Sequence, residues 1–266
     1  MEDEYLQKVR VHYPTAERSE LLGKELVKYI HEHYGLPPEK IMAANSICSD
    51  DVNAMQFPHS VKDFLGPFNM GGLNGFPFTG LTGMKAFFHH VPKDGALLIF
   101  FAPHIGINKE GRPGLIKRVG QPADSSCCGA AVGALPKPTS DNSTDVATHS
   151  AASNTCENID YQMDCIKALF EQNRSTIINS RYPIVAATQV MYTAINKRIH
   201  ELVDRARNEM HCEYLFLVGG IFINGDAGQG SFVDYKHGSV IRKPHEAKNN
   251  ETDLLNEFLA YHNKNL

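Results

Sequence analysis

The sequence contains no tryptophan, no long hydrophobic run and no strong charge imbalance. Its longest apolar stretch falls far short of the roughly 20 residues that a membrane-spanning helix needs. The net charge at pH 7 is −4 and no cluster of Lys and Arg stands out, which argues against a nucleic-acid partner. The 266 residues, 42% of them hydrophobic, can bury the core of one large domain or two small ones.

Cysteine is also scarce: there are six, none in a CxxC pair, although Cys127 and Cys128 are adjacent. This is not the dense disulfide framework of a small secreted protein. The N-terminal stretch MEDEYLQK is acidic and polar, unlike a secretory signal or a transit peptide. We therefore expect a soluble intracellular protein with free or metal-bound thiols.

What the chain does contain is an alternation of helical and strand patterns. Such an alternation predicts an α/β protein, a single domain over 1–266 whose central mixed, largely parallel sheet is flanked by helices. Helices are expected at 16–34, 158–178 and 183–206 and near the C-terminus, and strands at 41–47, 96–102, 114–119 and 213–224. No internal repeat is visible.

Three further segments complete the expected organisation. Residues 16–40 are expected to form an N-terminal helical arm. Residues 136–158 form a polar surface loop or insertion, because Ser, Thr, Asn or Asp fills twelve of the seventeen positions in 139–155. Residues 66–83 contain six Gly interleaved with Phe and are expected to form a structured apolar loop.

Residues able to bind a metal follow two of the predicted strands. Cys48 ends one apolar run and His104 follows another, and ligands of open α/β sheets bind beyond the carboxyl ends of strands. Cys128 precedes Gly129 at a predicted helix start, where backbone amides favour a thiolate. Cys, His and Cys suit Zn²⁺ and leave one tetrahedral position open, as in a catalytic site.

Asp50 lies two residues beyond Cys48, close enough to approach the same metal, and it could also cap the turn that follows. A carboxylate beside zinc needs a partner, and a bidentate pair with Arg would provide one. Arg118 and Arg112 are both candidates, and Arg118 is preferred because it lies on the strand predicted at 114–119.

The stretches ICSDD, FNMGGLNGFPFTGLTGMKAFFHHVPKDG, LLIFFAPHIGI, SSCCGAA and GGIFIN resemble the limiting-CO2-inducible B/C proteins of algae. That family is similar to β-type carbonic anhydrases in fold and zinc site. The resemblance runs from about Asn45 to Asp226, apart from the polar insertion. It implies Zn²⁺ held by Cys48, His104 and Cys128, with an acid/arginine dyad in which Asp50 is the acid.

The sequence departs from ordinary β-carbonic anhydrases in two respects. Those enzymes carry Arg two residues after the Asp, where this chain has Val52, so the arginine must come from elsewhere. Their second ligand pair is His-x-x-Cys, whereas here Cys128 comes 24 residues after His104. Cys127 remains an alternative to Cys128, which is preferred because the following Gly permits a tight start to the helix.

The resemblance implies reversible hydration of CO2 to bicarbonate by zinc-bound hydroxide, in inorganic-carbon acquisition. It also implies a homodimer, to which the apolar faces near 16–34 and 184–206 could contribute, or a hetero-oligomer with a related subunit. The expected compartment in a photosynthetic eukaryote is the plastid stroma. Two alternatives stay open: a catalytically silent partner subunit that keeps the zinc, and a cysteine hydrolase with Cys128 as nucleophile and His104 as base.

Overall fold

The computed structural model describes residues 3–137, 158–242 and 251–265. The predicted polar insertion at 136–158 lies almost entirely outside these ranges. None of the helices in the described ranges is long and apolar enough to cross a membrane.

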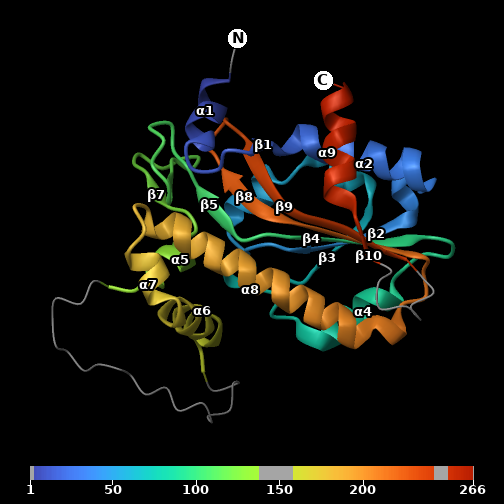
Figure 1. Ribbon diagram of the computed structural model, residues 1–266. Helices are drawn as coiled ribbons and strands as arrows, with labels where there is room; N and C mark the ends of the chain where they lie inside the picture. The colour runs from blue at the N-terminus through green and yellow to red at the C-terminus, as the bar shows by residue number, and fades with distance from the viewer. Residues whose placement is uncertain (1–2, 138–157, 243–250, 266) are drawn as a thin grey trace.

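A mixed sheet forms the centre of the molecule and is visible edge-on in Figure 1. Its main strands follow the order β1-β9-β8-β4-β2-β3, with β10 paired to β9 and β5 paired to β8. The strands are β1 (Glu17–Arg18), β2 (Ile41–Ser46), β3 (Leu65–Asn69), β4 (Ala96–Phe101), β5 (His104–Gly106), β8 (Tyr214–Asn224), β9 (Ser231–Arg242) and β10 (Glu251–Asp253).

The strands from β8 to β3 are parallel, whereas β9 runs antiparallel to β8 and to its other two neighbours. Ten of the eleven residues of β8 are buried, which explains its nearly continuous apolar sequence. The predicted fold class, a single α/β domain with a mostly parallel sheet between helices, is confirmed.

Helices cover both faces of the sheet, and each face has its own buried core (Figure 1). α2 (Ser19–Tyr34) and α9 (Leu254–Asn265) contact one face through Ile30 and Phe258. α4 (Gly80–His89) and α8 (Pro183–Ala206) pack on the other.

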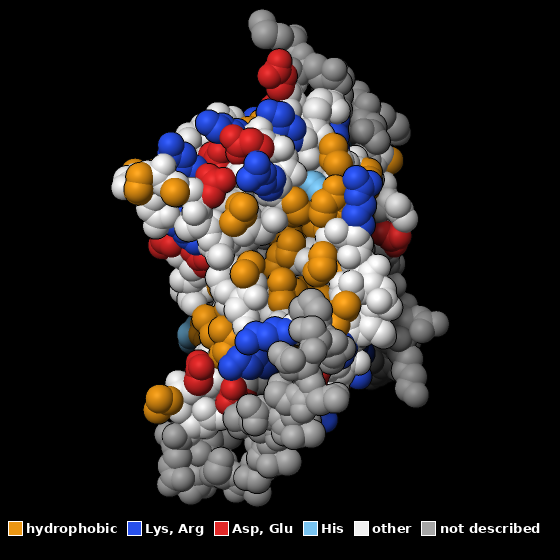
Figure 2. Space-filling model, turned by 90° about the vertical axis from the view of Figure 1, so that its left-hand side faces the viewer, with side chains coloured by type: hydrophobic (Ala, Val, Ile, Leu, Met, Phe, Trp, Pro, Cys, Tyr) orange, Lys and Arg blue, Asp and Glu red, His pale blue; other side chains and the backbone are white. Residues whose placement is uncertain are grey.

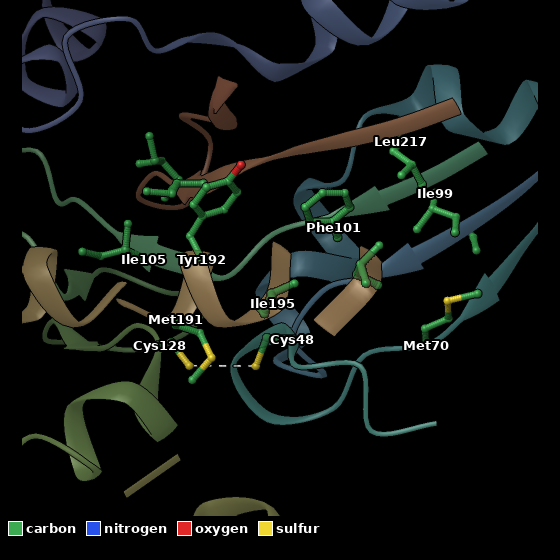
Figure 3. Close-up of a cluster of buried hydrophobic side chains, with 14 of the residues drawn as sticks. Cys48, Met70, Ile99, Phe101, Ile105, Cys128, Met191, Tyr192, Ile195 and Leu217 are labelled. Carbon is green, nitrogen blue, oxygen red and sulfur yellow. Dashed lines mark hydrogen bonds between the residues drawn. The ribbon is translucent and has the colours of Figure 1, made fainter. Parts of the chain in front are cut away.

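The second of these cores contains two of the predicted metal ligands. Cys48 and Cys128 lie among the apolar side chains of α8 and the sheet, including Met191, Ile195 and Ile105 (Figure 3). α8 presents this face because its buried residues recur at helical spacing after Pro183, which occupies its first turn.

Short elements connect these layers. They are α1 (Glu4–Arg10), α3 (Asp51–Gln56), α5 (Gly129–Gly133), α6 (Tyr161–Gln172), α7 (Arg174–Ile178), the two-stranded β6 (Leu115–Ile116) with β7 (Ser125–Ser126), and 3-10 turns at Pro38–Lys40, His59–Asp63, Leu73–Gly75 and Arg207–Glu209.

Several predicted boundaries were wrong. The helix expected at 158–178 is divided into α6 and α7, and the strand expected at 114–119 contains only Leu115 and Ile116. The loop expected at 66–83 includes most of edge strand β3 and the beginning of α4. His104 does not merely follow a strand: it begins β5, which pairs with the end of β8.

Candidate metal centre

The carboxyl ends of the central strands bring the predicted ligands together. Cys48 follows β2, His104 begins β5 after β4 has ended, and Cys128 is the N-cap residue of α5. Because β2, β4 and β8 run parallel, the segments that leave them meet at one edge of the sheet.

The three ligand atoms of Cys48, His104 and Cys128 lie within 4.8 Å of one another, and all three residues are buried. The two sulfurs are 3.9 Å apart. Thiolate and imidazole donors in such a group match the preference of Zn²⁺ for sulfur and nitrogen. With a second thiol at this distance and Cys128 only 1% exposed, the arrangement suits a metal better than a cysteine nucleophile.

His104 is oriented by a neighbouring strand. Its Nδ1 lies 2.8 Å from Oδ1 of Asn224, the last residue of β8, and Asn224 in turn donates from Nδ2 to Gln56. An amide oxygen only accepts, so Nδ1 carries the proton. The Nε2 atom is buried and has no hydrogen-bond partner among the described residues. In the neutral ring this atom therefore carries no proton, and its lone pair is directed into the cluster.

A glycine-rich turn supports Cys48. The backbone N–H of Asn74 donates to Cys48 Sγ at 3.1 Å, which favours the thiolate. This turn approaches the strand ends so closely that a Cβ at Gly71 would lie 2.1 Å from the Ile47 carbonyl oxygen. At Gly75, with φ of +79°, a Cβ would lie 2.3 Å from the Ala102 carbonyl oxygen. The segment predicted as an apolar loop thus shapes the centre through its backbone.

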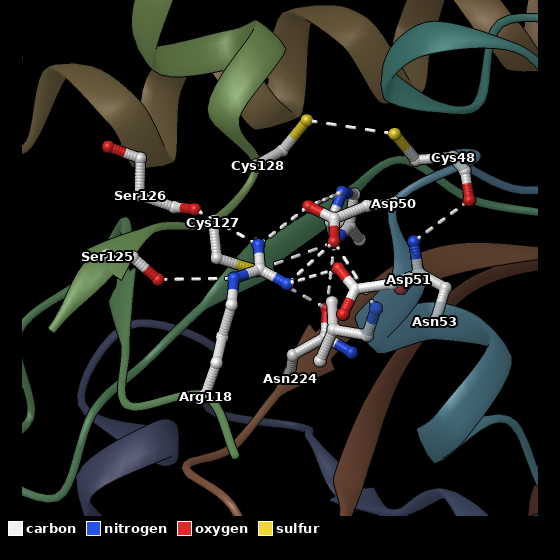
Figure 4. Close-up of polar contacts among 12 residues, drawn as sticks. Cys48, Asp50, Asp51, Asn53, Arg118, Ser125, Ser126, Cys127, Cys128 and Asn224 are labelled. Carbon is white, nitrogen blue, oxygen red and sulfur yellow. Dashed lines mark hydrogen bonds and ion pairs between the residues drawn. The ribbon is translucent and has the colours of Figure 1, made fainter. Parts of the chain in front are cut away.

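Asp50 pairs with Arg118 beside the cluster (Figure 4). Arg118 donates Nη1 to Oδ1 at 2.8 Å and Nη2 to Oδ2 at 2.9 Å, a bidentate arrangement. Asp50 also accepts from the Val52 N–H at the start of α3, so the capping role and the ion pair coexist. Its Oδ2 lies 3.9 Å from His104 Nε2, at the unpartnered side of the imidazole.

Arg118 is itself held in place by the β7 strand. Its Nε donates to Ser125 Oγ at 3.1 Å and its Nη2 to the Ser126 carbonyl at 3.3 Å, while Nη1 also reaches Asp51 at 2.7 Å. The preference for Arg118 rested on a predicted strand that in the structure stops at Ile116. The Arg118 side chain nevertheless makes the expected contact with Asp50. The alternative, Arg112, is exposed and its backbone N–H bonds to Asn108.

The ionisation of these groups follows from their contacts. A hydrogen bond from Cys128, together with the contacts to His104, outweighs the opposing effect of burial and lowers the pKa of the Cys48 thiol to about 4. Burial raises the pKa of Asp50, but the Arg118 and Asp51 contacts outweigh it and the net pKa falls to about 2. Asp50 is therefore a carboxylate at neutral pH.

Cys127 belongs to a different arrangement. Its Sγ is 3.6 Å from His104 Nδ1, the nitrogen already directed at Asn224, and 3.7 Å from Asn224 Oδ1. With Asp50 and His104 it forms a second possible ligand group that contains one thiol instead of two. The sequence argument that favoured Cys128 is not supported: Gly129 lacks a positive φ and has open space where a Cβ would be.

A cavity of about 540 Å³ opens beside the cluster, with Cys48, Asp50 and Asn53 on its wall. Asn53, buried in α3, donates to the Cys48 carbonyl at 3.1 Å. Asn53, Asn74 and Asn224 were not predicted as site residues. Of the three, only Asn224 carried a signal, since it ends the most apolar strand of the sequence at the same sheet edge.

Fold and site together define an α/β protein with a buried group of two thiols and one imidazole, arranged as a metal could be held, at the carboxyl edge of its sheet. The family described as limiting CO2-inducible proteins B/C, β-carbonic anhydrases, matches residues 22–242. This match spans most of the chain, and the protein belongs to that family. The resemblance inferred from the sequence is confirmed.

Solved structures agree with this assignment. PtLCIB4, a homolog of the limiting CO2-inducible protein LCIB, is 26% identical with a TM-score of 0.75, over 89% of this chain and 95% of that chain. LCIB is 17% identical with a TM-score of 0.61, over 86% and 92%, and shows the shared fold. Among curated proteins no match was found.

Proposed function

We propose that this protein is a zinc-dependent carbonic anhydrase that hydrates CO2 reversibly to bicarbonate. The observation that carries the proposal is the buried, unpartnered Nε2 of His104, which faces two thiols 3.9 Å apart and an arginine-bound carboxylate. A polar atom buried without a partner is costly, and a metal ion would satisfy it.

The residues present fit Zn²⁺. Cys48, His104 and Cys128 would hold the ion, and their number leaves a fourth tetrahedral position for solvent. Bound zinc would supply a coordinated water whose pKa lies near 7. Asn224 fixes the imidazole tautomer and the Asn74 N–H stabilises the Cys48 thiolate, so neither ligand must reorganise to bind.

Asp50 would accept a hydrogen bond from that solvent molecule. Its carboxylate stays ionised, and because Arg118 engages both oxygens, it is held back from direct coordination. The adjoining cavity borders both Cys48 and Asp50 and would admit CO2 and release bicarbonate. The apolar side chains around Cys48 and Cys128 limit access of bulk water from the other side.

The test combines metal analysis with stopped-flow CO2 hydration on the same preparation. We expect one zinc at this centre per chain and measurable hydration, and Cys48→Ser should lose most of this metal and the activity. Cys212→Ser is the matched control, because Cys212 is also buried but belongs to none of the possible metal groups of the described residues. Full zinc content in Cys48→Ser would refute the ligand assignment.

The same experiment addresses the alternative of a catalytically silent subunit. Stoichiometric zinc without hydration, in a folded protein, would leave a zinc-binding partner subunit as the function. In a photosynthetic eukaryote, we further propose a role in inorganic-carbon acquisition in the plastid stroma.

A further inference from the structure

A second group of metal-binding side chains lies outside the candidate metal centre and shares no residue with it. His200 of α8, His237 of β9 and Glu251 of β10 each offer one ligand atom, and these atoms lie within 4.8 Å of one another. The two Nε2 atoms approach the same Glu251 Oε1, at 3.6 Å and 3.8 Å. Two imidazoles from separate elements therefore converge on one carboxylate.

The orientation of His200 is that of a metal ligand. Its Nδ1 lies 2.8 Å from the Asn196 backbone carbonyl, which only accepts, so Nδ1 carries the proton. In the neutral ring, Nε2 then presents its lone pair toward Glu251. A backbone carbonyl that fixes the distal ring nitrogen is the usual support of metal-bound histidine.

The two rings are nearly perpendicular, with an interplanar angle of 83° and centroids 4.9 Å apart. His237 Nε2 also lies 3.0 Å from Ser239 Oγ, a hydroxyl that can rotate to accept or donate. The perpendicular arrangement lets both imidazoles point at a common centre without stacking on each other.

Exposure and charge also suit a cation. The three side chains are 30%, 24% and 42% exposed, so an ion can reach them from solvent. Asp204 and Asp253 act electrostatically on His200 and His237, respectively, and add negative charge around the group. Burial lowers the pKa of His237, which favours the neutral ring that a metal requires, whereas the contact with Glu251 raises the pKa of His200, so a metal competes with a proton at that ring.

We propose that His200, His237 and Glu251 form a second metal site, which binds one Zn²⁺ or a similar divalent transition-metal ion. Two imidazoles and one carboxylate are a known zinc donor set, with solvent in the remaining position. The ion would connect α8 to the β9–β10 edge, where β10 pairs with β9 through three of its described residues. A bound ion would therefore stabilise the contact between α8 and the β9–β10 edge. The proposal does not depend on the proposed hydration activity.

Cobalt(II) titration of tag-free, metal-depleted protein distinguishes the two sites. Cobalt at the thiolate centre gives sulfur-to-metal charge-transfer absorption, whereas cobalt at the His–His–Glu site does not. We expect wild type to bind two cobalt ions per chain. Glu251→Gln and His237→Ala should each bind one and keep the charge-transfer band, and Cys48→Ser should lose the band and retain the second ion.

His89→Ala is the matched control, because His89 lies 3.5 Å from Glu209 yet belongs to no three-residue ligand group in the described ranges. It should bind two ions, and circular dichroism should show native folding for every variant. One cobalt per wild-type chain, with the charge-transfer band, would overturn the second site. A second ion that persists in folded Glu251→Gln would also overturn it. If wild type instead bound one cobalt ion without the charge-transfer band, and Glu251→Gln lost that ion, the thiolate centre would be refuted and the second site would stand.

Discussion

At the scale of single residues, the candidate centre includes side chains outside the proposed ligand set. Asp50 forms an ion pair with Arg118, and its Oδ2 lies 3.9 Å from the unpartnered Nε2 of His104. A substitution can therefore remove its charge and leave its position unchanged. Its neighbours in the sequence gave the position, since Asp50 follows Cys48 closely. The sequence also pointed to its partner, because Arg118 was preferred over Arg112, although the strand behind that preference stops at Ile116 and the contact joins residues 68 positions apart.

We expect Asp50→Asn to keep zinc content near wild type and to lower CO2 hydration by about 10²-fold or more, the usual scale for a positioned acid/base group. The amide preserves the size of the side chain but removes its negative charge, and only one of its two polar atoms can accept a hydrogen bond. Zinc analysis and stopped-flow hydration on one sample measure both quantities. Undiminished hydration at full zinc would leave Asp50 as the cap of α3 only.

Arg118→Ala should reduce hydration to a similar extent, because Asp50 loses the bidentate partner that holds it away from the metal position. Arg112→Ala is the control. Arg112 is exposed and makes no ion pair among those found for the described residues, so hydration should stay close to wild type. Equal losses in the two variants would contradict an Asp50–Arg118 dyad.

At the scale of elements, long periodic patterns were predicted well and short or glycine-rich elements were not. The buried residues of α8 recur at helical spacing, and β8 is buried almost throughout, so a periodic and a continuous apolar pattern mark these two elements in the sequence. β3 is an edge strand with mostly exposed residues and no alternation to recognise. α4 begins with glycine and is stabilised by packing against α8, a tertiary effect that local propensity does not contain.

The same limit applied to the site. Cys48 and His104 were recognisable because they follow apolar strands, but the contributions of Asn74 and Asn224 depend on contacts across the sheet edge. The glycines of 66–83 were visible as a group, although their function was not. They allow backbone to approach backbone, and this holds the Asn74 N–H against Cys48.

Gly71→Ala should therefore destabilise the protein by about 1–3 kcal/mol, the usual cost of overpacking, and weaken metal retention. The added Cβ would lie 2.1 Å from a backbone oxygen, which cannot move aside cheaply. Chemical denaturation and zinc retention against a chelator measure the two effects. In the control Gly129→Ala, beside Cys128 but with open space, stability should be unchanged or rise by up to about 1 kcal/mol. Similar behaviour of the two variants would refute the close-approach argument.

At the scale of the whole molecule, the surfaces first suggested for a dimer are used within the chain. The apolar faces of α2 and α8 pack on the chain's own sheet. Figure 2 shows another surface, on the side that carries β7, α5 and α7 in Figure 1, where hydrophobic side chains gather in a continuous band. A patch of this kind on a folded protein commonly marks an interface.

We still expect a homodimer, formed through a surface other than the buried faces of α2 and α8. Light scattering over a concentration series should give twice the chain mass of 29.5 kDa at micromolar concentration. Copurification with a related subunit would indicate the hetero-oligomer instead. A monomer throughout the series would contradict the homodimer.

The hydrogen bond between His104 and Asn224 joins residues 120 positions apart, across the paired strands β5 and β8. Contacts of such sequence separation form late, because loop-closure entropy must be overcome before they contribute. Until then, Cys48 and Cys128 belong to a flexible chain and have no fixed geometry toward each other. We therefore expect the centre to form late in folding, so that in the newly made protein its thiols are open to oxidation before they can bind a metal.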